Sequence, residues 1–150
     1  MRSYRWVLFA VLVAAAFAAD RGASADYVGG TISNPPAKGG VIDLTDDQHL
    51  QFKTGKTDLR IPYERIQLIE YGQQVGRRYA MAIIISPMLL LSKSRKHFVT
   101  LGYTDDEGHQ QAMVLQVDKA HIRALLVSLE TRTGRKVQYQ DSEARKAGKG

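Results

Sequence analysis

Four histidines are the first candidates for metal binding or proton transfer in this chain: His49, His97, His109 and His121. None of them stands at metal-ligand spacing from another histidine, and no His-Glu-x-x-His motif occurs. The chain also contains no cysteine, so disulfides, thiolate metal sites and cysteine nucleophiles are excluded. The sequence therefore predicts no metal site and no cofactor.

Carboxylates offer a second kind of chemistry. Asp105, Asp106 and Glu107 are consecutive, and a hard cation such as calcium favours oxygen ligands, but the alternate-residue spacing of a calcium loop is missing. Glu64 and Glu70 could act as an acid–base pair only if the fold brought them into one cleft. No Gly-x-Ser-x-Gly nucleophile motif is present. We therefore expect a non-catalytic protein, and a hydrolase or metal enzyme is the third of three alternatives.

The most unusual stretch is residues 80–91, which is apolar apart from Ser86 and Pro87 and has basic residues on both sides. Twelve residues are too few for a helix that crosses a bilayer, which needs about 20. The candidate lipid-binding or partner-binding residues are Arg77, Arg78, Ile84, Ile85, Met88, Leu89, Leu90, Leu91, Lys93, Arg95 and Lys96.

Three interpretations of this segment remain open. In the structural one, residues 79–85 form a buried strand, Pro87 turns the chain, and residues 88–91 pack under the sheet. In the second, the segment dips into a membrane face while its basic flanks contact lipid phosphates. In the third, it covers a groove on a partner protein.

The N-terminal 25 residues have the pattern of a secretory signal peptide. A basic head that contains Arg2 and Arg5 precedes an apolar run at residues 7–19, and Ala23-Ser24-Ala25 supplies small residues for cleavage before Asp26. A retained membrane anchor is the alternative, but thirteen apolar residues are too few to span a bilayer. We expect a signal peptide at 1–25, a domain at 26–139, a flexible tail at 140–150, and a periplasmic or secreted location.

Charge and composition narrow the class of partner. The chain carries 21 Lys and Arg against 15 Asp and Glu. Removal of residues 1–25 would take away three Arg and one Asp, which leaves 18 basic and 14 acidic residues and a net charge of +4. So mild an excess is not typical of a nucleic-acid-binding protein. An exported domain without disulfides has to be held together by its core, which favours a bacterial envelope.

The elements that would position these residues are mostly short strands. Apolar residues alternate at residues 41–44, 50–52, 59–63 and 66–72, and again on both sides of a Gly-containing turn at 104–108, which predicts a hairpin. A weaker strand is expected near residues 27–32, and a last extended piece at 137–139. Asp118 has the character of an N-cap, and an apolar helical stripe follows before Gly134. The stripe consists of Ile122, Leu125, Leu126 and Leu129.

These elements suggest a mainly β domain with one C-terminal α-helix. At residues 59–66, 69–72 and 97–105, followed by the closing helix, the chain resembles the pleckstrin-homology-like superfold in its bacterial, GRAM-like form. The resemblance implies a curled antiparallel sheet, or partly open barrel, that is capped by the helix. It also implies a binding or adaptor domain in an exported protein of unknown function.

We therefore expect a non-catalytic exported binding module, with peripheral membrane association through residues 80–91 and their basic flanks. The alternative is recognition of an envelope protein or peptide on the sheet edge beside the closing helix. The expected partners are an anionic membrane surface or an envelope protein, and no nucleic acid.

Overall fold

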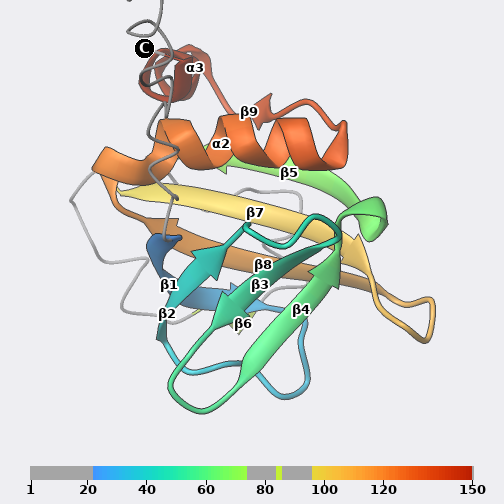
Figure 1. Ribbon diagram of the computed structural model, residues 1–150. Helices are drawn as coiled ribbons and strands as arrows, with labels where there is room; N and C mark the ends of the chain where they lie inside the picture. The colour runs from blue at the N-terminus through green and yellow to red at the C-terminus, as the bar shows by residue number, and fades with distance from the viewer. Residues whose placement is uncertain (1–21, 74–83, 86–95, 150) are drawn as a thin grey trace, which may run out of the picture.

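A computed structural model describes residues 22–73, 84–85 and 96–149 of the chain (Figure 1). The described elements are β1 (Ala23–Gly30), β2 (Gly39–Asp43), β3 (His49–Lys53), β4 (Asp58–Pro62), the 3-10 turn η1 (Tyr63–Arg65), β5 (Ile66–Gly72), β6 (Ile84–Ile85), β7 (His97–Thr104), β8 (Gln110–Val117), α2 (Lys119–Thr133), β9 (Gln138–Tyr139) and α3 (Ser142–Lys149). The predicted mainly β architecture with a C-terminal helix is confirmed.

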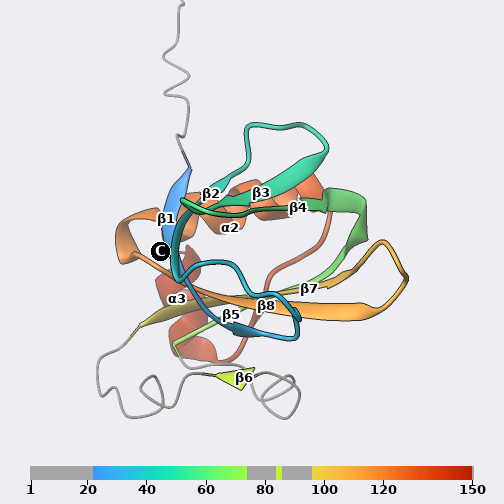
Figure 2. The same ribbon diagram turned by 90° about the horizontal axis from the view of Figure 1, so that it is seen from below.

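The described strands belong to one sheet in the order β4-β3-β2-β1-β8-β7-β5-β9, with β6 on β1. Neighbouring strands are antiparallel, except that β9 runs parallel to β5. The sheet curls without closing, so β4 and β9 are its two ends. Figure 2 shows β2, β3 and β4 on one side of the core and β5, β7 and β8 on the other.

Alternation of buried apolar residues with more exposed residues explains the strands in the first half of the chain, as in β3. In β3, Leu50 and Phe52 are fully buried, while the residues between and after them are more exposed. The β7–β8 hairpin turns at Gly108, whose φ of 86° lies in the left-handed region that glycine adopts readily. In this hairpin both faces are buried, since Phe98, Thr100 and Val114 are covered on the face opposite the main core. Both faces of β7 and β8 are therefore shielded from solvent.

Helix α2 lies over the curled sheet with its predicted stripe inward (Figure 1). Each of the four stripe residues is at most 3% exposed, and burial of one such side chain contributes about 1.5–3 kcal/mol. Gly134 ends the helix with a φ of 69°, and its N–H donates to the Glu130 carbonyl at 2.9 Å, as predicted. Asp118 stands at the predicted N-cap position, but its carboxylate forms no capping hydrogen bond.

The C-terminal region differs from the predicted flexible tail at 140–150, because residues 142–149 form α3, a second helix. Ala144 and Gly148 are buried one turn apart on the same helical face. A Cβ added at Gly148 would lie 2.6 Å from Tyr139 and 3.2 Å from Leu126, so the absence of a side chain lets α3 approach closely. This stretch was predicted to be a tail because most of its residues are charged, but Ala144 and Gly148 are small enough to let the helix pack.

The start of the domain also differs from the boundary predicted at residue 26. Strand β1 begins at Ala23, and Ala23 and Ala25 are only 5% and 4% exposed. These residues pair with Ile42 and Gly40 of β2, and Ala25 also pairs with Val117 of β8. The folded unit therefore includes residues that the sequence pattern places in the signal peptide.

Candidate functional site

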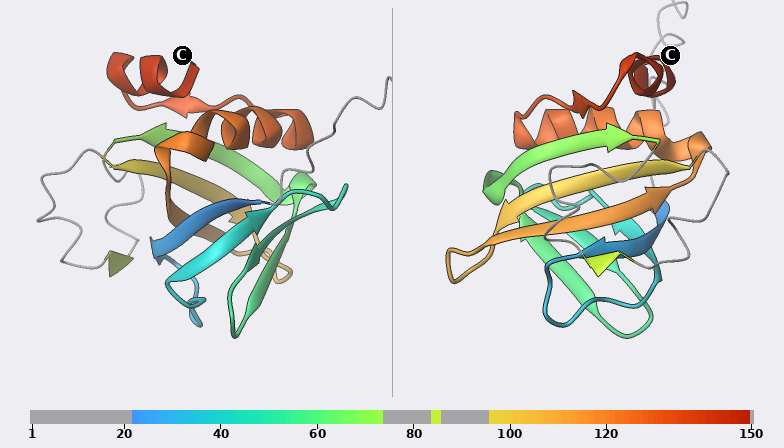
Figure 3. Two further views of the ribbon diagram at one scale, coloured as in Figure 1. Left: turned by 60° about the vertical axis from the view of Figure 1, so that its left-hand side comes forward. Right: turned by 180° about the vertical axis from the view of Figure 1, so that it is seen from behind.

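Most of the predicted binding residues lie outside the described part of the chain: Arg77, Arg78, Met88, Leu89, Leu90, Leu91, Lys93 and Arg95. Ile84 and Ile85 form β6, whose backbone pairs with Gly30 and Gly29 of β1 (Figure 3). Lys96 is half-buried and directly precedes β7. The middle of the apolar segment is therefore joined to the sheet through its backbone, as a strand in part of the region where the structural interpretation expected one.

A groove opens where β5 ends and β7 begins, against α2 and α3. It has a volume of about 1070 Å³ and widens to solvent. We call it the basic groove, because its described lining includes Lys119, Arg123 and Lys146 together with His97, Gln73 and Glu143. Among the described lining residues, three basic side chains therefore face one acidic side chain.

The position of the basic groove links it to the predicted binding segment. Gln73 is the last described residue before residues 74–83, and His97 follows the end of residues 86–95. Both residues line the groove. Gln73 directly follows β5 and His97 is the first residue of β7, and these two strands are paired, with Gly72 opposite Phe98. The described residues that flank the predicted binding segment on either side therefore lie at this groove.

His97 sits at the floor of the basic groove beside a buried tyrosine. Its Nδ1 lies 2.6 Å from the Tyr71 hydroxyl, and the two rings are stacked with their centroids 6.0 Å apart. Partial burial lowers the pKa of His97 below 6.5, and the nearby positive charge of Lys119 lowers it further. His97 therefore favours its neutral form more than a free histidine does, and the fixed charge of the groove comes from Lys119, Arg123 and Lys146.

Helix α3 forms one wall of the groove and is held there by several contacts. The Arg123 Nε donates to the Ala147 carbonyl at 3.3 Å, and Lys149 lies over the Tyr139 ring at 5.6 Å from its centroid. The Asp141 carboxylate accepts from the Ala144 N–H at 2.6 Å, which satisfies a free amide at the start of α3. Because Ala144 is completely buried, α3 is a packed part of the domain.

The sequence contains a partial signal for this groove. Lys119 and Arg123 are four residues apart on α2 and so lie on one helical face, at the border of the buried stripe. That spacing is visible in the sequence, although the predicted site did not include either residue. Lys146 could not be added, because the stretch around it was interpreted as a tail.

The opposite end of the molecule is acidic and holds the β7–β8 hairpin turn. The Asp105 carboxylate accepts from the backbone N–H of Glu107 at 3.0 Å and of His109 at 2.8 Å, and from Gln111 Nε2 at 2.9 Å. These hydrogen bonds, that from Gln111 above all, lower the pKa of Asp105 below 3.8. Asp106 forms an ion pair with Arg65. The carboxylates of this turn therefore have structural partners.

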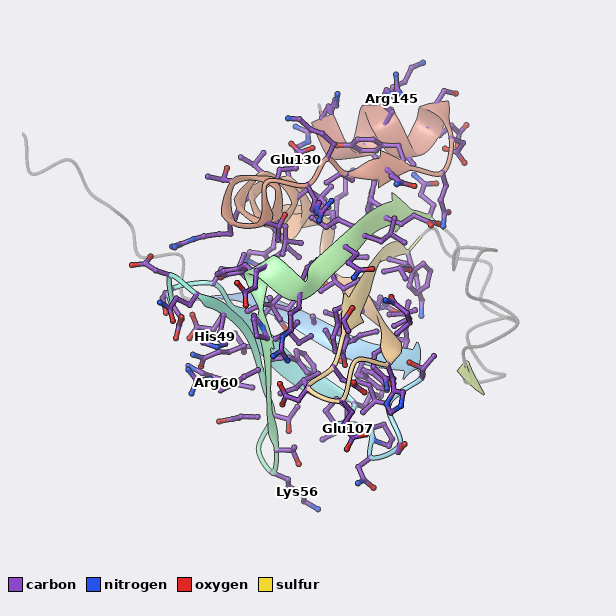
Figure 4. The ribbon with its side chains drawn as sticks, turned by 90° about the vertical axis from the view of Figure 1, so that its right-hand side faces the viewer. His49, Lys56, Arg60, Glu107, Glu130 and Arg145 are labelled. Carbon is purple, nitrogen blue, oxygen red and sulfur yellow. The ribbon has the colours of Figure 1, made fainter. Side chains whose placement is uncertain are left out.

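The same turn brings together three possible metal ligands. Ligand atoms of Asp105, Glu107 and His109 all lie within 4.8 Å of one another. Glu107 and His109 are exposed, as Figure 4 shows for Glu107 at the hairpin tip. Because the hydrogen bonds of Asp105 already account for its place in the turn, we assign no metal to this cluster.

A second, smaller cavity of about 370 Å³ lies between β4 and the hairpin. Its apolar lining includes Ile32, Leu59 and Tyr103, and the Arg65–Asp106 pair stands in its wall. Burial raises the pKa of Tyr103 to about 12, so its hydroxyl stays protonated. The cavity offers no group that ionises near neutral pH within its apolar lining.

The two glutamates considered as an acid–base pair line neither the basic groove nor the smaller cavity. Glu64 is exposed in η1, whereas Glu70 is 8% exposed in β5 and accepts a hydrogen bond from Gln140 Nε2 at 2.9 Å. The structure therefore gives these two carboxylates different surroundings and no shared cleft.

None of the helices among the described residues is both long and apolar enough to cross a membrane. No protein-family model matches the chain, and no curated protein matches it either. The basic groove, with the segment that begins and ends beside it, is the candidate functional site.

Proposed function

We propose that this chain is an exported, non-catalytic binding module that associates reversibly with an anionic membrane surface through its basic groove. We also propose that it acts in the periplasm or outside the cell, and that its fold is pleckstrin-homology-like. One observation carries the proposal: Lys119, Arg123 and Lys146 line the same groove as Gln73 and His97, the described residues on the two sides of the predicted binding segment.

The order of elements supports the proposed fold. An antiparallel meander, β1 to β4, is followed by β5, β7 and β8, and then by a helix that packs over the curled sheet. The resemblance implies a partly open sheet capped by a helix, and this order of elements supports the proposal.

The charges of the basic groove are free to act on a ligand. Within the described residues, neither Lys119 nor Lys146 forms an ion pair. Each Lys or Arg close to an anionic surface contributes about 1 kcal/mol. Three such residues would therefore contribute about 3 kcal/mol at low ionic strength, and salt would weaken the contact because the Debye length is about 8 Å at physiological ionic strength.

The apolar residues of the segment have a divided role in this proposal. The backbone of Ile84 and Ile85 is used in pairing with β1. We therefore assign the apolar part of the membrane contact to Met88, Leu89, Leu90 and Leu91, with Lys93, Arg95 and Lys96 beside them in the sequence.

Vesicle flotation tests the proposal. Protein that lacks the apolar N-terminal run but keeps the whole of β1 is mixed with vesicles. The vesicles consist of neutral lipid alone or contain added anionic lipid, and binding is measured at low and high salt. We expect binding only to the anionic vesicles at low salt. The K119Q/K146Q variant removes two exposed charges and should bind about thirtyfold more weakly, since two contacts of about 1 kcal/mol each are lost.

A matched control separates a local effect from one of net charge. K38Q/K56Q removes the same charge from exposed lysines in loops that do not line the basic groove, and it should bind like the unchanged protein. Equal binding to neutral vesicles, or equal losses in both double variants, would contradict the proposal.

Recognition of a peptide at the sheet edge beside α2 has less support. That edge is β5, and the chain's own β9 pairs with it at Glu70 and Tyr71. An envelope protein captured by the protein in the absence of lipid, with the same loss in K119Q/K146Q, would replace the membrane with a protein partner.

A further inference from the structure

Strand β1 conflicts with cleavage after Ala25. Ala23 and Ala25 point into the main core and are almost fully buried. Three of the four β1–β2 pairs, at Ala23, Ser24 and Ala25, lie before this predicted cut. A chain that began at Asp26 would keep only the pair with Gly39, so β2, together with β3 that pairs with it, would lose most of its connection to β1.

Gly22 gives a second, independent sign that the fold extends upstream. Its φ of 79° is one that residues with side chains rarely adopt. A Cβ at this position would also overlap the Ile42 carbonyl oxygen and Cγ1 of Val41. The backbone of residue 22 therefore lies against β2, and only glycine fits there.

The sequence offers another cleavage site that would leave this strand whole. Residues 6–13 are apolar, and Ala16 and Ala18 then provide small residues at the spacing that a signal peptidase requires. An eight-residue apolar core and a short alanine-rich exit are within the normal range for a signal peptide. Cleavage here would leave Ala19, Asp20 and Arg21 ahead of Gly22.

Resting on the export part of the proposed function, we infer that an envelope signal peptidase cuts the Ala18–Ala19 peptide bond, and not the bond after Ala25. Water is the co-reactant: hydrolysis leaves a carboxylate on Ala18 and a free amino group on Ala19. The mature protein then consists of residues 19–150, with β1 complete. The mature N-terminus comes directly before a strand that the core requires.

Intact-mass measurement tests this directly. The full chain is expressed in a bacterial host, recovered from the envelope fraction, and its mass is compared with those of residues 19–150, 26–150 and 1–150. We expect the first mass. Either of the other two, or any other start, would overturn the inference.

Two matched variants sharpen the test without touching the folded domain. Ala18→Leu places a large residue at the predicted cut and should leave most of the chain at its full mass. Ala15→Leu makes the same change three residues earlier and should be processed normally. Maturation of Ala18→Leu to a chain that begins at Asp26 would show that the downstream site is used.

The result is distinguishable from failure of the membrane proposal. If the protein begins at Ala19 but does not bind anionic vesicles, the inferred cleavage site stands and the membrane proposal fails. If the protein binds these vesicles but begins at Asp26, the membrane proposal stands and the inferred cleavage site is wrong.

Discussion

The two ends of strand β7 carry opposite charges: the hairpin end, at residues 104–109, is acidic, and the groove end, beside His97, is basic. At the hairpin end, Asp105 accepts hydrogen bonds within its own turn and Asp106 pairs with Arg65. At the groove end, Lys119 and Lys146 form no ion pair with a described residue. Figure 4 shows how far apart these ends are, with Glu107 at the hairpin tip and Arg145 on α3.

This contrast teaches how to distinguish structural charge from charge available to a ligand. The acidic cluster is contiguous in the sequence, whereas the basic residues are dispersed over residues 119–146. Its carboxylates are nevertheless occupied by backbone amides and a guanidinium, so they stabilise the turn. Lys119 and Lys146 lie on two helices whose packing does not depend on them, and neither forms an ion pair with a described residue.

The largest expected effect comes from breaking the groove end at α3. Ala144→Asp would bury an unpaired carboxylate at a position that is completely buried, and should lower the free energy of unfolding by about 2–4 kcal/mol. Urea unfolding measures the loss, and hydrogen exchange locates it. If amides of the hairpin end lose as much protection as those of α3, the two ends are not independent.

A smaller loss is expected from the hairpin end. Asp105→Ala removes the acceptor for two backbone N–H groups and Gln111, and should lower the free energy of unfolding measurably, because these donors lose their partner. Asp106→Ala is the matched control, since its side chain is 93% exposed, and it should cost less than about 1 kcal/mol. Similar losses in the two variants would refute the structural role given to Asp105.

Acid should weaken the two ends in different pH ranges. The folded pKa of His97 lies below 6.5, so the unfolded chain binds this proton more readily, and stability should fall as the pH drops below about 6.5. The pKa of Asp105 is lowered from 3.8, so its contribution should be lost only below that value. The midpoint temperature of thermal unfolding should fall between pH 7.5 and pH 5 in the unchanged protein, and it should fall less in His97→Gln.

The smallest effect is predicted for charge at the hairpin end on vesicle binding. D106N/E107Q removes two exposed acids far from the basic groove. With a Debye length of about 8 Å, binding to anionic vesicles at physiological salt should change by less than about twofold. Flotation beside K119Q/K146Q measures it, and a change as large as in that variant would mean that net charge alone drives association.

Much of the sheet followed from alternation in the sequence. Leu50, Phe52, Leu115 and the helical stripe were all predicted to be buried and are. The start of β1 was missed because its first residues are Ala, Ser and Ala, whose small size suits both a peptidase and a tightly packed strand. Local pattern does not distinguish these uses, whereas pairing with β8, some ninety residues later, does.

The candidate site was less predictable than the fold. The sequence drew attention to residues 80–91 because apolar residues there are consecutive, but the groove is assembled from β5, β7, α2 and α3. Packing of α3 depends on Ala144 and Gly148, which contribute almost no hydrophobic signal of their own. A site that forms where distant elements meet has no contiguous motif to find.

The pairing of β1 with β8 has a consequence for how the chain assembles. Ala25 lies opposite Val117, so the strand made first meets a principal partner only after nearly the whole domain has been synthesised. Contacts so distant in sequence slow folding, because the intervening loop must be closed before they are gained. A polypeptide with this topology therefore exposes β1 without its β8 partner during most of its synthesis, and the sheet is completed only after residue 117 has been added.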